Sequence, residues 1–404
     1  MNIPTQIIIF GITGDLSRQK ILPSLFSLYI EDRLPEKLSI VGFSRRNFSK
    51  YDIEDFVRNV LPEHERREDF VKLFSYIAGD FSYLQSYMRL KDHVERTDLS
   101  FSQCSNKLYY LSVAPLYYEM ILTSLKESSL SLPCGGDLGW ARVLVEKPFG
   151  YDIHSSKRLN ALVDTLFQKE QIYRVDHYMA KTSLQEIIDI RRDEVIGARW
   201  NAQYIKQIRI DLQETATVEK RGEFYDSLGV VYDVGQNHIL QMIALALRPI
   251  MEKENASDIQ HAREVVFESL SVDREFAHRA QYEGYRTHAN VPPSSETETY
   301  IDVTLYSALE GFVGVPIRVV SGKGCPKSFT AVTVVWKDGT ESVFETPSSE
   351  SQSAYKKVLI DCMDGEQAVF TSGREVELGW HIAEEMKRVI QQKPLELYQM
   401  YSML

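Results

Sequence analysis

The segment YRVDHYMAK, residues 173–181, places an aspartate, a histidine and a lysine close together in the chain. Asp176 and His177 are neighbours, and Lys181 follows His177 by four residues. If the segment is helical, His177 and Lys181 share one face, where two potential cations could hold an anion. The alternative is a solvated helix start with a carboxylate near a cation. The rest of the chain has to distinguish an anion site from an ordinary helix end.

A second histidine, His238, stands in YDVGQNHILQM, at the start of an apolar helical stretch and five residues after Asp233. A histidine beside a buried helix is commonly a packed core residue. It can equally act as a general base, if a carboxylate orients the far nitrogen of its ring. Asp176 is a candidate for that carboxylate, because we expect both residues to face the junction between two domains.

The segment GITGDLS, residues 11–17, lies between a predicted buried strand and a predicted amphipathic helix. Its Gly11-x-x-Gly14-Asp15 pattern is a variant of the dinucleotide-binding fingerprint. Glycine lets the backbone turn tightly and approach a pyrophosphate, whose charge is held at the helix N-terminus. Many strand-to-helix turns contain glycine, so it is the position directly after the first strand that favours a cofactor site.

The second predicted strand ends in FSRRNF, with Arg45 and Arg46 where an NAD site typically has an acidic residue for the ribose. A guanidinium group at that place favours a 2′-phosphate, and therefore NADP. Thr13 could add a hydroxyl hydrogen bond to the same phosphate. Two ordinary surface arginines are the alternative interpretation.

The N-terminal third alternates apolar strand-like runs with amphipathic helical segments. This alternation predicts a Rossmann-type, doubly wound parallel sheet. The predicted strands are 6–10, 39–45, 106–115 and 140–150, and the predicted helices are 17–32, 51–61 and 116–127.

The second half has strands in succession with few helices between them, which predicts an α+β domain with a large, mainly antiparallel sheet. We place the boundary near Arg174, which gives an NADP-binding domain, 1–174, and an α+β domain, 175–404. The predicted strands are 203–215, 296–307, 316–322 and 329–341, with a hairpin turn at KDGT, and the predicted helices are 228–247, 353–365 and 374–392.

The composition restricts the class of protein. The 404-residue chain is 44% apolar and 25% charged, ordinary values for a globular protein. Its net charge of −11 argues against binding nucleic acid or an anionic membrane, so positive charge for an anionic ligand must be local. The four cysteines show neither CxxC nor a metal-ligand spacing. We therefore expect no metal, a reducing compartment and, without a signal peptide or membrane span, a cytoplasmic location.

Taken together, the motifs resemble the glucose-6-phosphate dehydrogenase family along nearly the whole chain. The most specific are VEKPFG, the triplet DHY with a lysine four residues after its histidine, and QNH about sixty residues further on. The longer matching segments are FGITGDLSRQKILPSLF, VGFSRR, NKLYYLSVAP, GVPIRVVSGKGCPK and AYKKVLIDCMDGEQAVF.

This resemblance implies oxidation of C1 of glucose 6-phosphate to 6-phospho-D-glucono-1,5-lactone, with hydride transfer to NADP, as the first step of the oxidative pentose phosphate pathway. His238 matches the catalytic base, and Asp176 matches the carboxylate that orients it. The Lys147–Pro148 peptide bond is expected to be cis on the same ground.

The family also implies that residues 175–404 form a substrate-binding and oligomerisation domain, and it implies roles for the remaining positions. Phosphate binding is implied for His177, Tyr178, Lys181 and, as a second phosphate lysine, Lys327. Other substrate contacts are implied for Lys147 near the nicotinamide, for Glu214 and Asp233 on sugar hydroxyls, and for Lys323. Cofactor binding is implied for Gly11, Thr13, Gly14, Asp15, Leu16, Arg45 and Lys147.

The sequence departs from the family pattern in places that affect these expectations. Ala180 stands where glycine is usual and Thr182 where glutamate is usual, so another sugar phosphate is an alternative substrate. The C-terminal sheet region is short, which leaves a second, structural NADP site open and weakens the expectation of a homodimer. A non-catalytic NADP-binding regulator is a further alternative, which the joint presence of Asp176, His238 and two candidate lysines disfavours.

Overall fold

The computed structural model describes residues 3–134, 139–347 and 349–402. The chain forms two compact units. The first unit contains Met1–His177 together with Ser351–Thr371, and the second contains Tyr178–Glu350 together with Ser372–Leu404. The first unit thus includes a late segment that the expected domains, 1–174 and 175–404, left in the second.

The first unit is built on a seven-stranded sheet with the order β13-β6-β5-β4-β1-β2-β3. All neighbours from β3 to β6 run parallel, and only β13 at the edge is antiparallel. The predicted doubly wound parallel sheet is confirmed. Its strands are β1 (Thr5–Phe10), β2 (Leu38–Ser44), β3 (Phe74–Ala78), β4 (Asn106–Leu111), β5 (Ala141–Val145), β6 (Ile172–Val175) and β13 (Phe370–Thr371).

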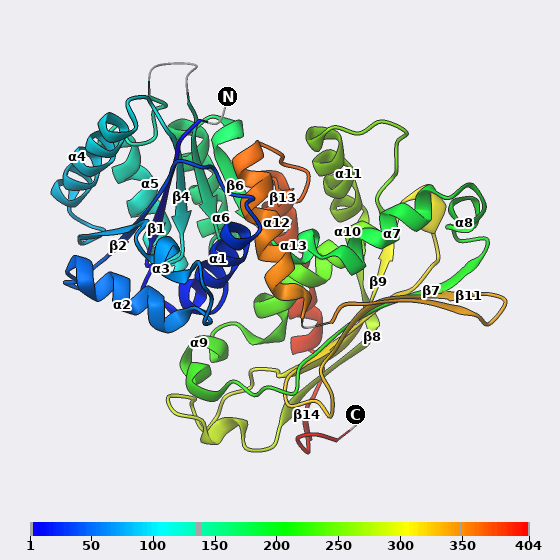
Figure 1. Ribbon diagram of the computed structural model, residues 1–404. Coiled ribbons are helices and arrows are strands. Elements are labelled where there is room, and N and C mark those ends of the chain that lie inside the picture. Colours follow the sequence, from blue (N-terminus) through cyan, green and yellow to red (C-terminus); the bar gives the residue numbers. More distant parts are fainter. Residues whose placement is uncertain (1–2, 135–138, 348, 403–404) are drawn as a thin grey trace. The chain divides into compact units, whose positions relative to one another are not determined.

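Apolar runs explain why these segments form the buried sheet. Every residue of β1 and β4 is buried, as expected for strands covered by helices on both faces. Figure 1 shows helices on both sides of this sheet. They are α1 (Leu22–Ile30), α2 (Lys50–Val60), α3 (Arg67–Val71), α4 (Leu84–Phe101), α5 (Tyr118–Glu127), α6 (Ile153–Leu166) and α12 (Glu350–Asp364).

Polar contacts fix the returning helix α12 on the first unit. Lys356 on α12 donates to Glu31 at the end of α1 over 2.5 Å. Arg142 on β5 donates to the carbonyl of Cys362 over 2.7 Å. These contacts join segments more than 200 residues apart in sequence, so local sequence patterns could not predict them.

Cys104 and Cys134 form a disulfide bond in the first unit. The cysteine spacing gave no sign of this pairing, and the bond runs against the expectation of a reducing compartment. Cys325 and Cys362 are buried free thiols.

The second unit is built on another seven-stranded sheet, with the order β12-β11-β7-β10-β9-β8-β14. Only β7–β10 and β8–β14 pair in parallel, so the predicted mainly antiparallel sheet is confirmed. The strands are β7 (Ile205–Gln213), β8 (Leu270–Tyr282), β9 (Tyr300–Ser307), β10 (Ile317–Gly322), β11 (Phe329–Trp336), β12 (Glu341–Glu345) and β14 (Leu395–Tyr398).

Helices of the second unit lie on one face of its sheet, as Figure 1 shows for α7, α10 and α13. A fully buried ion pair between Arg263 and Glu375, 2.7 Å long, joins α11 to α13. The helices are α7 (Thr182–Arg192), α8 (Glu194–Arg199), α9 (Gly222–Asp226), a π-helix (Val231–Ile239), α10 (Leu240–Leu247), α11 (Ala256–Ser269) and α13 (Gly373–Gln391).

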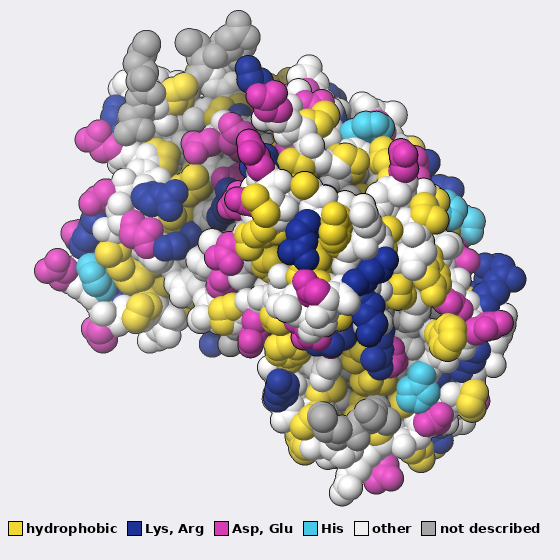
Figure 2. Space-filling model, turned by 90° about the vertical axis from the view of Figure 1, so that its right-hand side faces the viewer, with side chains coloured by type: hydrophobic (Ala, Val, Ile, Leu, Met, Phe, Trp, Pro, Cys, Tyr) yellow, Lys and Arg dark blue, Asp and Glu magenta, His cyan; other side chains and the backbone are white. Residues whose placement is uncertain are grey.

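Charged side chains of both signs share the surface. Figure 2 shows acidic and basic side chains intermixed with apolar ones on the face that it presents. Within the described part of the chain, no helix combines the length and apolar character needed to span a membrane.

Candidate active site

Most predicted positions of the first unit follow the carboxyl ends of its parallel strands. Gly11 follows β1, Arg45 follows β2, Lys147 comes two residues after β5, and Asp176 follows β6. Parallel strands bring these ends to one edge of the sheet, which is where open α/β sheets bind their ligands. The sheet order reverses between β1 and β4, so the ligand crevice is expected there.

Gly11 turns the chain sharply at that crevice. Its φ is +75°, and its N–H donates to the carbonyl of Phe43 over 2.8 Å. A Cβ atom at this position would lie 2.3 Å from the carbonyl oxygen of Ser112, which follows β4. Only glycine allows this turn, and the close backbone approach is what a dinucleotide-binding loop requires.

Gly11→Ala is expected to destabilise the protein and to weaken NADP binding. Left-handed backbone strain alone costs about 1–2 kcal/mol, and the clash with Ser112 adds to it. Gly339 is a matched control, because its φ is +89° but a Cβ atom there would meet nothing within 4 Å. Denaturant unfolding and NADP titration should show a larger loss for Gly11→Ala than for Gly339→Ala. Equal losses of stability, with unchanged NADP affinity, would contradict the predicted role of this turn.

The candidate 2′-phosphate residues lie beside this turn. The Thr13 hydroxyl is 3.5 Å from that of Ser44, the last residue of β2. Arg45 is exposed, and its guanidinium carbon lies 5.6 Å from the centre of the Tyr117 ring. Asp15 is exposed and Leu16 half-buried, just before a π-helical turn, Ser17–Ile21, that leads into α1. The sequence predicted an ordinary helix there.

Lys147 and His177 occupy the other end of the same sheet edge. The Lys147–Pro148 peptide bond is cis, which confirms the expectation from the resemblance. Asp176 is buried, whereas His177 is half-buried and stacks on Tyr355 of α12 with 5.4 Å between ring centres.

Glu146, which the sequence analysis did not select, is buried directly before Lys147. The hydroxyl of Tyr110 on β4 donates to its carboxyl group over 2.5 Å. Burial raises the pKa of Glu146 to about 7, against the lowering effects of Tyr110 and Lys147. A clue was present in the sequence, since a glutamate directly after the apolar residues VLV of β5 requires a polar partner when buried.

In the second unit, Lys181, Tyr178 and His238 form a stack. The ammonium group of Lys181 lies 3.5 Å from the centre of the Tyr178 ring, within the range of a cation–π interaction. The Tyr178 ring stacks on the imidazole of His238 with 4.0 Å between ring centres and 22° between planes. The structure thus brings together two positions, 181 and 238, that the sequence analysis had assigned to phosphate and proton chemistry.

The conformation of the segment differs from the one we considered. His177–Ala180 is a 3₁₀-helix, and Lys181 is the N-cap of α7. An α-helical face shared by His177 and Lys181 is therefore wrong. His238 lies in the π-helix, inside the segment 228–247 that the sequence predicted to be helical, and π-helical turns frequently occur at functional sites.

A charged cluster links Lys323, Glu214 and Asp233. Because β7 and β10 run parallel, Glu214 and Lys323 both follow strand ends that lie side by side. The Lys323 ammonium group is 2.5 Å from the Glu214 carboxylate and 3.3 Å from that of Asp233. Burial opposes the charge of Lys323, but the two carboxylates outweigh burial and raise its pKa. The structure thus brings together the three residues that the resemblance assigned to the sugar and its hydroxyls, Glu214, Asp233 and Lys323.

The C-terminal strand, which the sequence analysis left out of the site, supports this cluster. The Tyr398 hydroxyl donates to the carbonyl of Lys323 over 2.5 Å, and the Tyr401 N–H donates to the carbonyl of Gly324 over 2.7 Å. These two bonds hold the loop after β10 from the side of β14.

Lys327 lies in a different setting from Lys323. It is exposed and lines a cavity of about 330 Å³ with Arg209, Asp211 and Arg318, residues of β7 and β10. Neither Lys181 nor Lys323 lines this cavity. The role of Lys327 as a second phosphate lysine stays a prediction.

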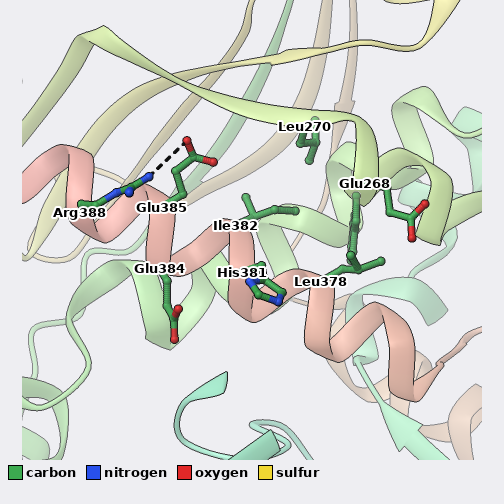
Figure 3. A pocket seen from close by; sticks show the side chains of 9 residues that line it. Glu268, Leu270, Leu378, His381, Ile382, Glu384, Glu385 and Arg388 are labelled. Atoms are coloured by element: carbon green, nitrogen blue, oxygen red, sulfur yellow. Dashed lines mark ion pairs between the residues drawn. The ribbon is translucent and has the colours of Figure 1, made fainter. Parts of the chain in front are cut away.

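Another cavity, of about 540 Å³, lies between α11 and α13 (Figure 3). Apolar side chains of Leu378 and Ile382 line it together with charged ones such as Glu268 and Arg388. None of the predicted site residues lines it, so cavity size alone does not locate the candidate chemistry.

Comparison with known proteins decides the family. Residues 8–186 match the model described as "Glucose-6-phosphate dehydrogenase, NAD binding domain", and residues 192–352 and 344–403 match that of the "Glucose-6-phosphate dehydrogenase, C-terminal domain". The chain belongs to the glucose-6-phosphate dehydrogenase family. Within this family, the chain is an oxidoreductase with NADP as cofactor.

Individual relatives agree with this assignment. The chain is 31% identical to glucose-6-phosphate 1-dehydrogenase of Leuconostoc mesenteroides, over 96% of this chain and 84% of the relative. It is 27% identical to the Chlamydia muridarum enzyme of that name, over 94% and 89%. A solved glucose-6-phosphate dehydrogenase from Mycobacterium avium superposes with a TM-score of 0.81 at 26% identity, covering 98% of this chain and 94% of that one.

The fold is shared still more closely with a solved glucose-6-phosphate dehydrogenase "in complex with its substrate glucose-6-phosphate". The TM-score is 0.89 at 23% identity, and the match covers 99% of this chain and 95% of the other. At this identity the likeness supports the fold alone, and the two sheets described above are those of the family.

Proposed function

We propose that the protein oxidises C1 of glucose 6-phosphate to 6-phospho-D-glucono-1,5-lactone with NADP, the first step of the oxidative pentose phosphate pathway. The observation that carries the proposal is the stack of Lys181, Tyr178 and His238. The Lys181 ammonium group, which suits a phosphate, and the His238 imidazole, which suits a proton, both lie against the ring of Tyr178. This arrangement fits a substrate that carries a phosphate at one end and a reacting hydroxyl at the other.

His238 is the proposed general base. Oxidation of a hemiacetal carbon requires the hydroxyl proton to leave as hydride departs from the same carbon, and a neutral imidazole has a pKa near working pH. Asp176 is the proposed carboxylate that orients His238 and stabilises the imidazolium that forms. NADP, when bound, supplies the hydride acceptor, and the protein fixes the geometry.

The remaining residues are proposed to hold the sugar and the cofactor. Binding of the phosphate by Lys181, His177 and Tyr178, with Lys327 as a second lysine, would orient the distant reacting carbon. Lys147 is assigned to substrate near the nicotinamide, and Lys323, Glu214 and Asp233 to the sugar and its hydroxyls. Proposed cofactor contacts come from Gly11, Thr13, Gly14, Asp15, Leu16, Arg45 and Lys147.

A turnover assay tests this function. NADPH absorbance should rise with glucose 6-phosphate and NADP, and much more slowly with other hexose phosphates or with unphosphorylated glucose. Preference for a different hexose phosphate would favour the alternative substrate that Ala180 and Thr182 suggest. NADP binding without turnover on any sugar phosphate would favour a non-catalytic regulator.

Arg45 is expected to set the choice of NADP over NAD. A hydrogen bond to a charged group contributes roughly 1.5–3 kcal/mol, so Arg45→Ala should reduce that preference by about one to two orders of magnitude. The neighbouring arginine provides a matched control, because Arg46 is also exposed. Steady-state kinetics with both cofactors should show a smaller change for Arg46→Ala. A wild-type protein that already prefers NAD would rule out the assignment.

The oligomeric state and location belong to the same proposal. A homodimer is proposed from family resemblance, and analytical ultracentrifugation would test it. The cytoplasmic location stays a prediction from composition.

A further inference from the structure

The carboxyl group of Glu146 occupies a closed polar site inside the first unit. Glu146 is 7% exposed, and the two tyrosines that contact it, Tyr110 and Tyr118, are fully buried. Tyr110 comes from β4 and Tyr118 from α5, so the site is built from neighbouring elements of the sheet and its helix layer. A carboxyl group placed so deeply requires hydrogen-bond donors to be tolerated.

Hydrogen bonds hold the peptide group between Glu146 and Lys147 at both its carbonyl and its N–H. The Tyr118 hydroxyl donates to the carbonyl oxygen of Glu146 over 2.9 Å. The N–H on the other side of that peptide group belongs to Lys147, and it donates to the Glu146 carboxylate. Tyr110 in turn fixes this carboxylate over 2.5 Å. The backbone from which the Lys147 side chain projects is therefore clamped at its carbonyl and at its N–H.

We propose that Glu146, Tyr110 and Tyr118 are positioning residues for Lys147, and that the ionised carboxylate of Glu146 is the form that holds Lys147 in place. The inference rests on the proposed function, because it takes Lys147 to contact the substrate. It adds three residues that none of the sequence motifs assigned.

Two hydrogen-bond donors face the same carboxyl group, which explains the preference for the ionised form. A carboxylate accepts from both Tyr110 and the Lys147 N–H, whereas a protonated carboxyl group carries a hydrogen that needs an acceptor of its own. Burial raises the pKa of Glu146 to about 7, with Asp176 also raising it and Tyr110 and Lys147 lowering it. Tyr118 and Tyr355 also interact with Glu146, but burial raises the pKa of both hydroxyls well above the usual value, so both stay neutral where Glu146 titrates.

The expected consequence is an acidic limb in the pH profile of kcat/KM for glucose 6-phosphate. As pH falls through about 7, Glu146 gains a proton, the clamp on Lys147 loosens and kcat/KM decreases. The phosphate group of the substrate also titrates near this range. Glu146→Gln removes one titrating group, so the slope of log kcat/KM against pH on the acidic limb should decrease by one. The same variant should lower kcat/KM about tenfold at alkaline pH.

The two tyrosines form a matched pair that separates positioning from mere structural support. Both are fully buried and both donate one hydrogen bond to Glu146, but only Tyr110 contacts the carboxyl group. Tyr110→Phe removes a bond that favours the charged form, so the limb should move to higher pH. Tyr118→Phe loses the carbonyl contact, so kcat/KM should fall without a shift of the limb.

The outcomes distinguish this inference from the proposed function. Equal effects of the two tyrosine variants, with an unmoved limb in both and in Glu146→Gln, would overturn it while glucose 6-phosphate turnover stands. Absence of turnover by the wild-type protein would overturn the proposed function instead. If Glu146→Gln does not fold, the limb shift in Tyr110→Phe relative to Tyr118→Phe decides, with unfolding curves as the control for stability.

Discussion

Replacement of His238 by asparagine is expected to lower kcat by about 10²–10⁴ or more, because general base catalysis contributes an effect of that size. His238 is 4% exposed and lies in the π-helix, where its ring stacks on Tyr178. Asparagine retains polarity and approximate size but cannot accept a proton near neutral pH. The fold and NADP binding should therefore survive while turnover does not.

A second histidine of the same unit is a suitable control for this experiment. A ring nitrogen of His288 lies 2.9 Å from the Tyr282 hydroxyl, so His288→Asn also removes an imidazole with a polar partner. No role in the chemistry is proposed for His288. We expect kcat to remain within a few-fold of wild type in His288→Asn and to collapse in His238→Asn. Near-normal turnover in His238→Asn would remove His238 from the role of base.

The sheet strands were predictable wherever their apolar pattern was strong. β1 contains a continuous apolar run, β2, β4 and β5 are rich in apolar residues, and β7, β9, β10 and β11 show alternation or β-branched residues. Among the elements that the sequence did not predict, three have a physical reason in their own residues. β3 is mostly half-buried, so its apolar signal is weak, and the long helix α4 carries many charges. β8 has a polar sequence and a register irregularity between Val272 and Ala277.

The site was less predictable than the fold, because its contacts join distant segments. The bond between Lys323 and Glu214 spans 109 residues of chain, and it follows from a parallel pairing that no local pattern records. The contact of Tyr110 with Glu146 spans 36 residues and depends on β4 and β5 being neighbours. Motif resemblance supplied candidate residues for the first cluster. The second cluster became visible only through burial and hydrogen bonding.

Lys181→Ala is expected to raise KM for glucose 6-phosphate strongly while leaving KM for NADP little changed. A hydrogen bond to a charged group contributes roughly 1.5–3 kcal/mol, which corresponds to about 10- to 100-fold in binding. Lysine acts here as a point charge without a geometric fork, so its loss should weaken binding more than it reshapes the site. Phosphate binding also orients the distant reacting carbon, so kcat should fall somewhat.

Charge and packing must be separated at this position, because Lys181 is only 5% exposed and its ammonium group lies on the Tyr178 ring. Lys181→Met keeps an unbranched apolar chain against that ring but removes the charge. If Lys181 binds the phosphate, Lys181→Met and Lys181→Ala should raise KM for glucose 6-phosphate alike, and both should leave the slow turnover of free glucose nearly unchanged. Retention of a wild-type KM in Lys181→Met would instead show that Lys181 acts by packing on Tyr178. An equal loss with phosphorylated and free sugar would likewise contradict phosphate recognition, because losing a contact to the phosphate cannot weaken a sugar that carries no phosphate.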